Sequence, residues 1–240
     1  MATFVLVHGA FHGGWCWRRL VPLLRAGGHE VFAPTLTGLG ERAHLARPDV
    51  DLDTHVRDVT SVFEFEDLRD VILVGHSYGG MVITGVAGCA AERLAHLIYL
   101  DAFVPEPGQS LADLIGPAGV ADAQEKARVE GEGWLVPPFP VERFGIFSEN
   151  DVSWIGPKLM PHPIKTFLTP VRVTNPGFGV LPRSFIYCNQ PPMGFFEPFA
   201  QKARARNWRF HVLAAGHDAM VTAPREVAAL LLGIAAQAAM

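Results

Sequence analysis

The sequence predicts an α/β fold in which a mostly parallel sheet of about six strands carries helices on both faces. Short apolar runs alternate with segments of helical periodicity through residues 1–104, and the same alternation resumes over residues 183–240. Between these segments, residues 105–182 contain 12 of the 19 prolines and scattered aromatic side chains. We therefore expect a core built from 1–104 and 183–240, interrupted by a cap insertion of loops and a few short helices over 105–182.

The chain begins with the first strand and helix of this core. Residues 3–8 are an apolar run of β type that ends in the loop GAFHGG. Apolar side chains then recur at the spacing of one helix face over residues 17–24, and Gly27 and Gly28 close this helix. Residues 29–38 predict a second strand followed by a turn.

Two further strand and helix pairs follow. Asp53 is expected to cap a helix that buries the apolar side chains at helical spacing within residues 56–63. Residues 70–75 predict the third strand, and a helix is expected from about residue 81 to residue 95. The fourth strand is expected over residues 96–105, and the insertion begins at its end.

The alternation resumes after the insertion. Residues 183–188 and 209–215 predict strands, separated by a helix over 196–206, and the last helix is expected to start at Pro224. Because the insertion follows a strand of a parallel sheet, we expect it to lie over the carboxyl ends of the strands. Open α/β sheets bind their ligands there.

Composition and charge restrict the partners and the environment. The chain is 49% hydrophobic with a net charge of -4, and it has no basic stripe, so nucleic acid is not an expected partner. Its apolar stretches are too short to span a membrane, and no signal peptide precedes the first strand. Cys16, Cys89 and Cys188 lack metal-type spacing, which predicts free thiols and no metal. We expect a soluble cytoplasmic protein without a cofactor, whose oligomeric state stays open.

A serine stands where the third strand meets the following helix. The segment Gly75-His76-Ser77-Tyr78-Gly79 matches the Gly-x-Ser-x-Gly turn that exposes a serine hydroxyl between a strand and a helix. The glycines allow a strained turn and a close approach of strand and helix. The alternative is a glycine-rich loop with an ordinary serine, and the apolar strand before the motif favours a nucleophile at Ser77.

A serine nucleophile needs a base, and one histidine is placed to serve as that base. His217 follows the last predicted strand in the segment LAAGHDAM, 140 residues after Ser77. The other nine histidines lie in the first loop, beside the nucleophile, or on helices, strand starts and upstream loops. We therefore expect His217 to be the general base.

The carboxylate partner of the histidine departs from the usual order. It is normally expected just after the strand 183–188, but that stretch, residues 189–192, reads Asn-Gln-Pro-Pro. Asp218 adjoins His217, so its side chain should diverge, and Glu197 belongs to the next helix. Asp101 ends the strand beside that of the nucleophile, so we expect it to orient His217. The alternative is that Asp101 only caps the turn into the insertion.

An oxyanion formed by attack of Ser77 needs two preorganised N–H donors. The residue after the nucleophile supplies one, so we expect the backbone amide of Tyr78 to donate. The loop after the first strand supplies the other, and we expect it to be the amide of Ala10. Phe11 and the aromatic residues of the insertion, Trp154 among them, are expected to line an apolar substrate pocket.

Three segments give the chain a family resemblance. The stretch FVLVHGAFHGGWCWRRLVPLLRAGGHEV, together with GHSYGGM and GHDAM, resembles the α/β-hydrolase superfamily. The resemblance is greatest to its branch of plant methylesterases and hydroxynitrile lyases with their bacterial relatives. It spans residues 3–104 and 183–236, and it implies the α/β-hydrolase fold and ester chemistry. The strand IYLDAFVP also resembles the haloalkane dehalogenase strand that carries the acid at its end, which supports Asp101.

Two positions separate hydrolysis from cyanohydrin cleavage within this branch. The resemblance implies a first-loop threonine and a lysine beside the catalytic histidine in the lyases, whereas this chain has Gly9 and Asp218. A carboxylate beside the histidine would oppose a departing cyanide, so hydrolysis is favoured. The segment TLTGLGERAHLA is similar to esterases that cleave the methyl carbamate carbendazim.

The sequence therefore predicts a serine hydrolase of the carboxylesterase or carbamate type that cleaves a small ester or carbamate through an acyl-enzyme. Its partner is a small molecule rather than nucleic acid or a membrane. Two alternatives remain: a hydroxynitrile lyase or a lactone- or C–C-cleaving enzyme on the same site, and a ligand-binding member of the fold without catalysis.

Overall fold

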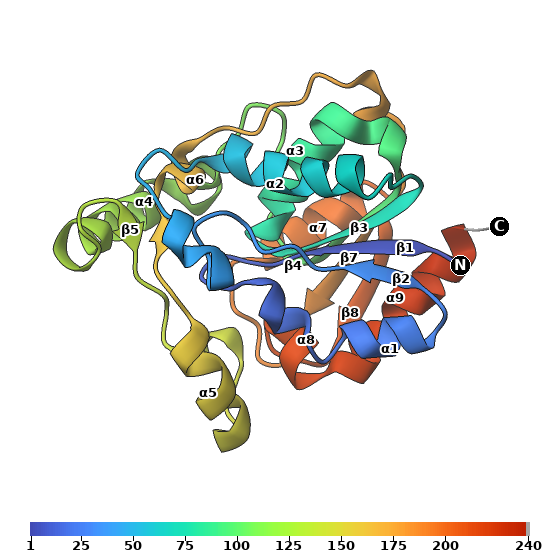
Figure 1. Cartoon of the computed structure of the whole chain (residues 1–240). Coiled ribbons are helices and arrows are strands. Elements are labelled where there is room, and N and C mark those ends of the chain that lie inside the picture. Colours follow the sequence, from blue (N-terminus) through green and yellow to red (C-terminus); the bar gives the residue numbers. More distant parts are fainter. Residues whose placement is uncertain (239–240) are drawn as a thin grey trace.

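The computed structural model describes residues 1–238, so the last two residues of the expected core segment lie outside the described residues. Six strands form one parallel sheet in the order β2-β1-β3-β4-β7-β8 (Figure 1), which confirms the predicted fold class and strand number. The strands are β1 (Thr3–Val7), β2 (Glu30–Phe32), β3 (Val71–Ser77), β4 (Leu94–Ala102), β7 (Arg183–Cys188) and β8 (Arg209–Leu213).

Helices cover both faces of the sheet (Figure 1). One face carries α2 (Leu52–Phe65), α3 (Gly79–Ala90) and α7 (Glu197–Ala205), and the other carries α1 (Val21–Ala26) and α9 (Pro224–Ala238). The short α8 (Ala219–Thr222) precedes α9. Within residues 1–238, no helix combines the length and the hydrophobicity that crossing a bilayer requires.

The strand order reverses between β1 and β3. The chain leaves β1 toward β2 at the edge and then returns to place β3 on the other side of β1. Loops that follow two such strands diverge and leave a crevice at the carboxyl end of the sheet. The loop after β1 and the turn at Ser77 therefore face each other across this crevice: a Cβ atom added at Gly9 would lie 2.8 Å from Ser77 Cβ.

The segment between β4 and β7 contains more helix than the sequence predicts. Its main element is α4 (Leu111–Glu130), and α5 (Glu149–Ile155), α6 (Lys165–Leu168) and an antiparallel pair, β5 (Leu135–Val136) with β6 (His162–Pro163), complete it. The expected short helices therefore miss the twenty-residue α4. The physical reason is Gly116, whose φ of 74° kinks α4 just before Pro117 and interrupts the sequence signal.

Three element boundaries differ from the sequence prediction. Asp51, not Asp53, caps α2, because its carboxylate accepts a hydrogen bond from the amide of Thr54 at 2.9 Å. The third helix starts directly after the turn at Ser77 and ends at Ala90, so β4 begins earlier than expected. The first helix is shorter, because residues 14–17 form a separate 3₁₀ turn.

The start of α3 is packed against the end of β4 without room for a side chain. We expect Gly80→Ala to lower the free energy of unfolding by about 3 kcal/mol, since its Cβ would clash with the carbonyl oxygen of Phe103. Gly233→Ala, on the exposed face of α9 with no atom near its Cβ, should instead raise it by about 0.5–1 kcal/mol. Urea unfolding of both variants checks this; equal stability would contradict the packing argument.

Candidate active site

Ser77 ends β3 in a strained turn. Its φ of +54° lies in the left-handed region, which L-residues adopt only when the surrounding structure enforces it. The neighbouring glycines make the turn possible: a Cβ atom at Gly79 would lie 2.6 Å from the carbonyl oxygen of Val7, and one at Gly75 would lie 2.6 Å from that of Gly79. The serine side chain is half-buried and lines a cavity.

A buried hydrogen bond joins the ends of β4 and β8. His217 Nδ1 lies 2.6 Å from Asp101 Oδ2, and both side chains are about 1% exposed. The other carboxylate oxygen, Oδ1, accepts a hydrogen bond from the amide of Cys188 at the end of β7. Burial raises the pKa of Asp101, although the bond to His217 opposes that shift. Asp101 thus lies where it can orient the imidazole.

The second nitrogen of His217 is available for chemistry. Its Nε2 atom is buried and has no hydrogen-bond partner among residues 1–238. The ring is stacked on Phe196, with centroids 4.7 Å apart and planes 7° apart, and it is also stacked with Phe144 at 6.3 Å. Both phenylalanines line the same cavity as Ser77. The imidazole also packs against His76, the residue before the serine, with ring centroids 4.4 Å apart.

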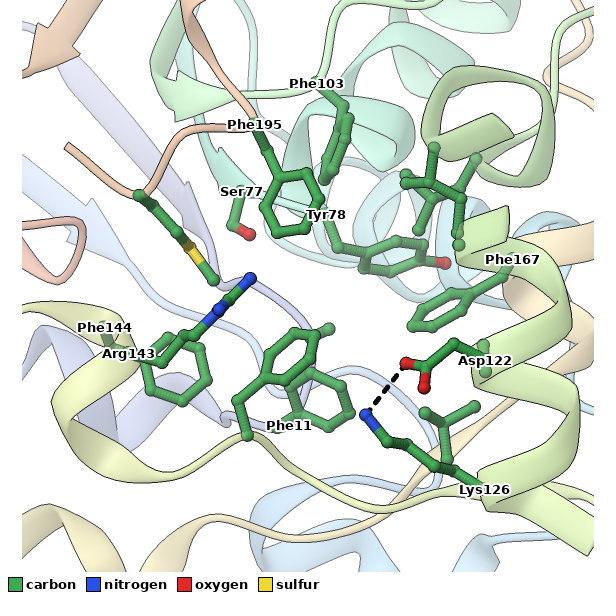
Figure 2. A pocket seen from close by; sticks show the side chains of 18 of the residues that line it. Phe11, Ser77, Tyr78, Phe103, Asp122, Lys126, Arg143, Phe144, Phe167 and Phe195 are labelled. Carbon is green, nitrogen blue, oxygen red and sulfur yellow. Dashed lines mark hydrogen bonds and ion pairs between the residues drawn. The ribbon is translucent and has the colours of Figure 1, made fainter. Parts of the chain in front are cut away.

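Ala10 and Tyr78, the two expected oxyanion donors, also line this cavity. The loop that carries Ala10 contains another strained residue, Phe11, with a φ of +69°. The phenol of Tyr78 points away from the serine in Figure 2, and its oxygen lies 2.9 Å from Nδ1 of the buried His55. The side chain of Tyr78 is therefore fixed in the core, next to the start of α3.

The cavity has a volume of about 410 Å³ and mostly apolar walls. Phenylalanines dominate them (Figure 2). They are Phe11, Phe103, Phe139, Phe144, Phe167, Phe195 and Phe196. Helix α4 adds aliphatic side chains, so the segment between β4 and β7 forms most of the wall that faces Ser77. Such a surface suits an aromatic or aliphatic ligand of small size.

Charged groups lie at one part of this wall. Lys126 and Asp122 of α4 form an ion pair of 2.8 Å (Figure 2). The Lys126 ammonium and the Arg143 guanidinium both lie over the ring of Phe139, at 5.6 and 5.5 Å from its centroid. Both cations attract the face of the aromatic ring, which favours this position of Phe139.

Trp154 lies elsewhere, although the sequence analysis places it in the substrate pocket. Its ring packs against Trp15, with centroids 6.3 Å apart, and the guanidinium of Arg19 lies 4.5 Å from its centroid. These contacts belong to α5, which Figure 1 shows projecting beside the core. Phe11, the other expected pocket residue, does line the cavity.

A second buried ion pair lies behind the site. His12 Nε2 is 2.9 Å from Asp218 Oδ2, and neither side chain is more than 1% exposed. The Asp218 carboxylate thus binds His12 and not His217, but it does not point far from His217: one of its oxygens lies within 4.8 Å of a ring nitrogen of His217. Burial alone would lower the pKa of His12 and raise the pKa of Asp218. The opposite charge of the partner outweighs this effect, so the pKa of His12 is raised and the pKa of Asp218 is lowered.

One group of side chains could offer metal ligands. His76, His217 and Asp218 place ligand atoms within 4.8 Å of one another, the one such group of three in the described part of the chain. Each of the three already makes one hydrogen bond: Asp218 to His12, His217 to Asp101 and His76 to the carbonyl oxygen of His217. The remaining atoms, His76 Nδ1, His217 Nε2 and Asp218 Oδ1, are buried without a hydrogen bond among the described residues.

Two groups near the cavity are not predicted from the sequence. His12 is expected only as a member of the first loop, and Phe196 is not among the expected pocket residues. A signal for His12 exists, because His8 and His12 flank the loop that carries Ala10. Aromatic residues of the insertion are expected in the pocket, and Phe139 and Phe144 do line it, but the fold of residues 105–182 decides which of them face Ser77.

Comparisons with known proteins agree with this geometry. Residues 4–230 match the model of the Alpha/beta hydrolase family. The chain is 41% identical over 242 residues to a carbendazim hydrolyzing esterase of Nocardioides sp. (strain SG-4G), covering 98% of this chain and 100% of that protein. It is 30% identical to pheophorbidase of Raphanus sativus, covering 95% and 92% of the two chains.

A solved structure agrees as well. An extracellular α/β-hydrolase from a Paenibacillus species superimposes with a TM-score of 0.82 at 28% identity, covering 97% of this chain and 98% of that one. The residues that match the family model span nearly the whole chain, and they include the three segments on which the resemblance rests. The chain therefore belongs to the α/β-hydrolase family.

Proposed function

We propose that this α/β-hydrolase is a serine esterase that cleaves small aromatic esters or carbamates through a covalent acyl-enzyme. The observation that carries the proposal is the buried Asp101–His217 hydrogen bond, which leaves Nε2 of the imidazole free beside the cavity that Ser77 lines. In this proposal Ser77 is the nucleophile, His217 the general base and Asp101 the carboxylate that orients it. The amides of Ala10 and Tyr78 bind the oxyanion.

Acylation begins with the serine hydroxyl. Its oxygen attacks the substrate carbonyl carbon while its proton passes to Nε2 of His217, and the carbonyl electrons move onto the oxygen. The resulting oxyanion accepts hydrogen bonds from the two backbone amides. When the tetrahedral intermediate collapses, the bond to the leaving group breaks, and His217 returns the proton to the leaving atom.

Deacylation repeats these steps with water. His217 takes a proton from water, whose oxygen attacks the acyl or carbamoyl carbon, and the bond to Ser77 breaks. The serine oxygen recovers its proton from His217. Asp101 stays ionised throughout and stabilises the imidazolium at each stage, as in the Ser-His-Asp enzymes.

The cavity and the comparisons support an aromatic substrate. Seven phenylalanines give walls on which a planar ring can stack, and a volume of about 410 Å³ suits a small molecule. The relative that is 41% identical is named for hydrolysis of carbendazim. We therefore include a methyl carbamate of that type among the substrates of this enzyme.

The residues beside the base disfavour the lyase alternative. Asp218 is buried and keeps its negative charge through His12, next to the imidazole that would have to release cyanide. The first loop has Gly9 where a hydroxyl side chain would be expected, and a Cβ there would crowd Ser77 Cβ at 2.8 Å. Both features favour hydrolysis.

Removal of the nucleophile tests the covalent route. We expect Ser77→Ala to lose at least about 10³-fold in kcat, because a triad member has been removed. It should also lose the burst of p-nitrophenol from p-nitrophenyl acetate and labelling by a fluorophosphonate probe. Ser61→Ala, on the exposed side of α2, is the matched control and should keep all three.

The same measurements separate the alternatives. Full turnover by Ser77→Ala would refute the acyl-enzyme, and an unlabelled wild-type protein without turnover of any ester or carbamate would point to a ligand-binding protein. Product analysis with an aryl methyl carbamate and a cyanohydrin distinguishes hydrolysis from cleavage of a cyanohydrin.

The carboxylate is tested by a substitution that preserves shape. We expect Asp101→Asn to lower kcat by about 10⁴-fold, as loss of the orienting carboxylate does in a related triad. Glu197→Gln should leave kcat unchanged, since Glu197 lies on α7, exposed beside Tyr187 and Gln201. Wild-type rates in Asp101→Asn together with a slow Glu197→Gln would reassign the carboxylate. Steady-state kinetics with p-nitrophenyl acetate measures both.

A further inference from the structure

The loop after β1 is held by imidazole rings at three successive positions. His8 Nδ1 lies 2.8 Å from the carbonyl oxygen of Gly9, and His12 Nδ1 lies 2.7 Å from that of Ala10. The amide of Phe11 donates to Nδ1 of His162, which belongs to β6, at 3.4 Å. The Gly9–Ala10 peptide, which carries the Ala10 N–H, is therefore fixed at its carbonyl, and the next peptide is fixed at both ends.

The hydrogen-bond partners determine the protonation of each ring. His8 Nε2 accepts from the amide of Leu36, so its Nδ1 carries the hydrogen, and burial lowers the pKa of His8 to about 3. His162 Nδ1 accepts, so its Nε2 donates to the hydroxyl oxygen of Thr166. His12 differs from both, because each of its nitrogens faces an acceptor oxygen. His12 is an imidazolium.

Asp218 links this imidazolium to the base. Its carboxylate binds His12 Nε2, and its amide donates to the carbonyl oxygen of Phe144, whose ring is stacked with His217. Since Asp218 directly follows His217, the pair ties the loop that carries the base to the loop that carries Ala10. The two loops come from residues 206 positions apart in the chain.

From this arrangement we infer that His12 and Asp218 are positioning residues, which hold the Ala10 amide at a fixed position relative to His217. This inference rests on the function proposed above. Phe11 shows why such a constraint is needed. A φ of +69° is unfavourable for a bulky residue, so an unconstrained loop would relax and move the neighbouring amide. An oxyanion donor displaced in this way loses transition-state stabilisation while ground-state binding is kept.

The pair lies among other titratable groups of the core. His8, His76 and His162 act on His12, and Cys16, His76, His217 and Asp101 face Asp218. Burial lowers the pKa of His8, His76 and His162 and raises that of Cys16, so these four groups are neutral at neutral pH. Asp218 Oδ1 lies 3.7 Å from His76 Nε2, and its Oδ2 lies 2.9 Å from His12 Nε2, so His12 is its nearer partner.

Two variants separate the hydrogen bond from the charge. His12→Phe removes the donor to Ala10, and we expect kcat to fall by about 10- to 100-fold with KM unchanged, less than the ~10²–10³ for a donor lost outright. Asp218→Asn should cost less than about 10-fold, because an amide can donate to Nε2 of a neutral His12 that still donates to Ala10. His96→Phe, which removes a buried histidine bonded to Ser184 far from the site, is the matched control and should change stability alone.

A pH profile gives a readout that a purely structural role would not move. The pKa of His12 is raised above its ordinary value of 6.5, and the pKa of Asp218 is lowered below its ordinary value of 3.8. The pair therefore contributes its full stabilisation between pH 3.8 and pH 6.5, the two ordinary values. Its contribution is lost as pH rises through the raised value of His12 or falls through the lowered value of Asp218. We expect kcat of the wild type to have an alkaline limb that Asp218→Asn removes.

The outcomes distinguish this inference from the proposed function. If the wild type is labelled at Ser77 and turns over esters, but His12→Phe and Asp218→Asn keep wild-type kcat and its alkaline limb, only the positioning role fails. If His12→Phe does not fold, Asp218→Asn alone decides through the pH profile. If the wild type is neither labelled nor active, the proposed function fails first.

Discussion

The hydrogen bond between Asp101 and His217 is the contact on which the rest of the site depends. Burying a carboxylate and an imidazole is unfavourable unless each finds a partner. Here the nearby amide of Cys188 occupies the carboxylate oxygen that His217 leaves free. The end of β7 thus supplies a hydrogen-bond donor where the usual order would supply the acid itself. In the proposed triad the carboxylate comes from β4, beside the strand of Ser77, and β7 contributes the amide that binds it.

Two buried carboxylates flank one imidazole, and this sets the electrostatics of the site. Burial raises the pKa of Asp101, and the charge of Asp218 adds to this shift because two negative charges in a region of low polarity repel each other. His12 lies 2.9 Å from the Asp218 carboxylate and lowers its pKa against the effect of burial. In the proposed site, a neutral residue at position 12 would leave both carboxylates facing His217 without a cation. The first loop would therefore supply a charge partner as well as the Ala10 amide.

The sequence predicts the parts of the site that local geometry or chain order determines. Gly75 and Gly79 identify Ser77, because only glycine permits that turn, and the position after the last strand identifies His217 as the base to be tested. The fold follows from the alternation of strands and helices. The pairing of His12 with Asp218 could not be predicted in this way, and neither could the position of Trp154. Both depend on how segments far apart in the chain pack against each other, and a local sequence pattern does not predict such packing.

The core of the chain and the segment between β4 and β7 supply different parts of the proposed site. The groups proposed to react or to support reaction lie at or just after the ends of β1, β3, β4 and β8, where the sheet fixes their separations. The cavity walls come mainly from the segment between β4 and β7, through α4 and Phe139, whose ring Lys126 and Arg143 contact. His162 connects the two, since it lies on β6 and binds the amide of Phe11. A change in the insertion that moved β6 would therefore alter the loop beside Ser77 as well as the shape of the pocket.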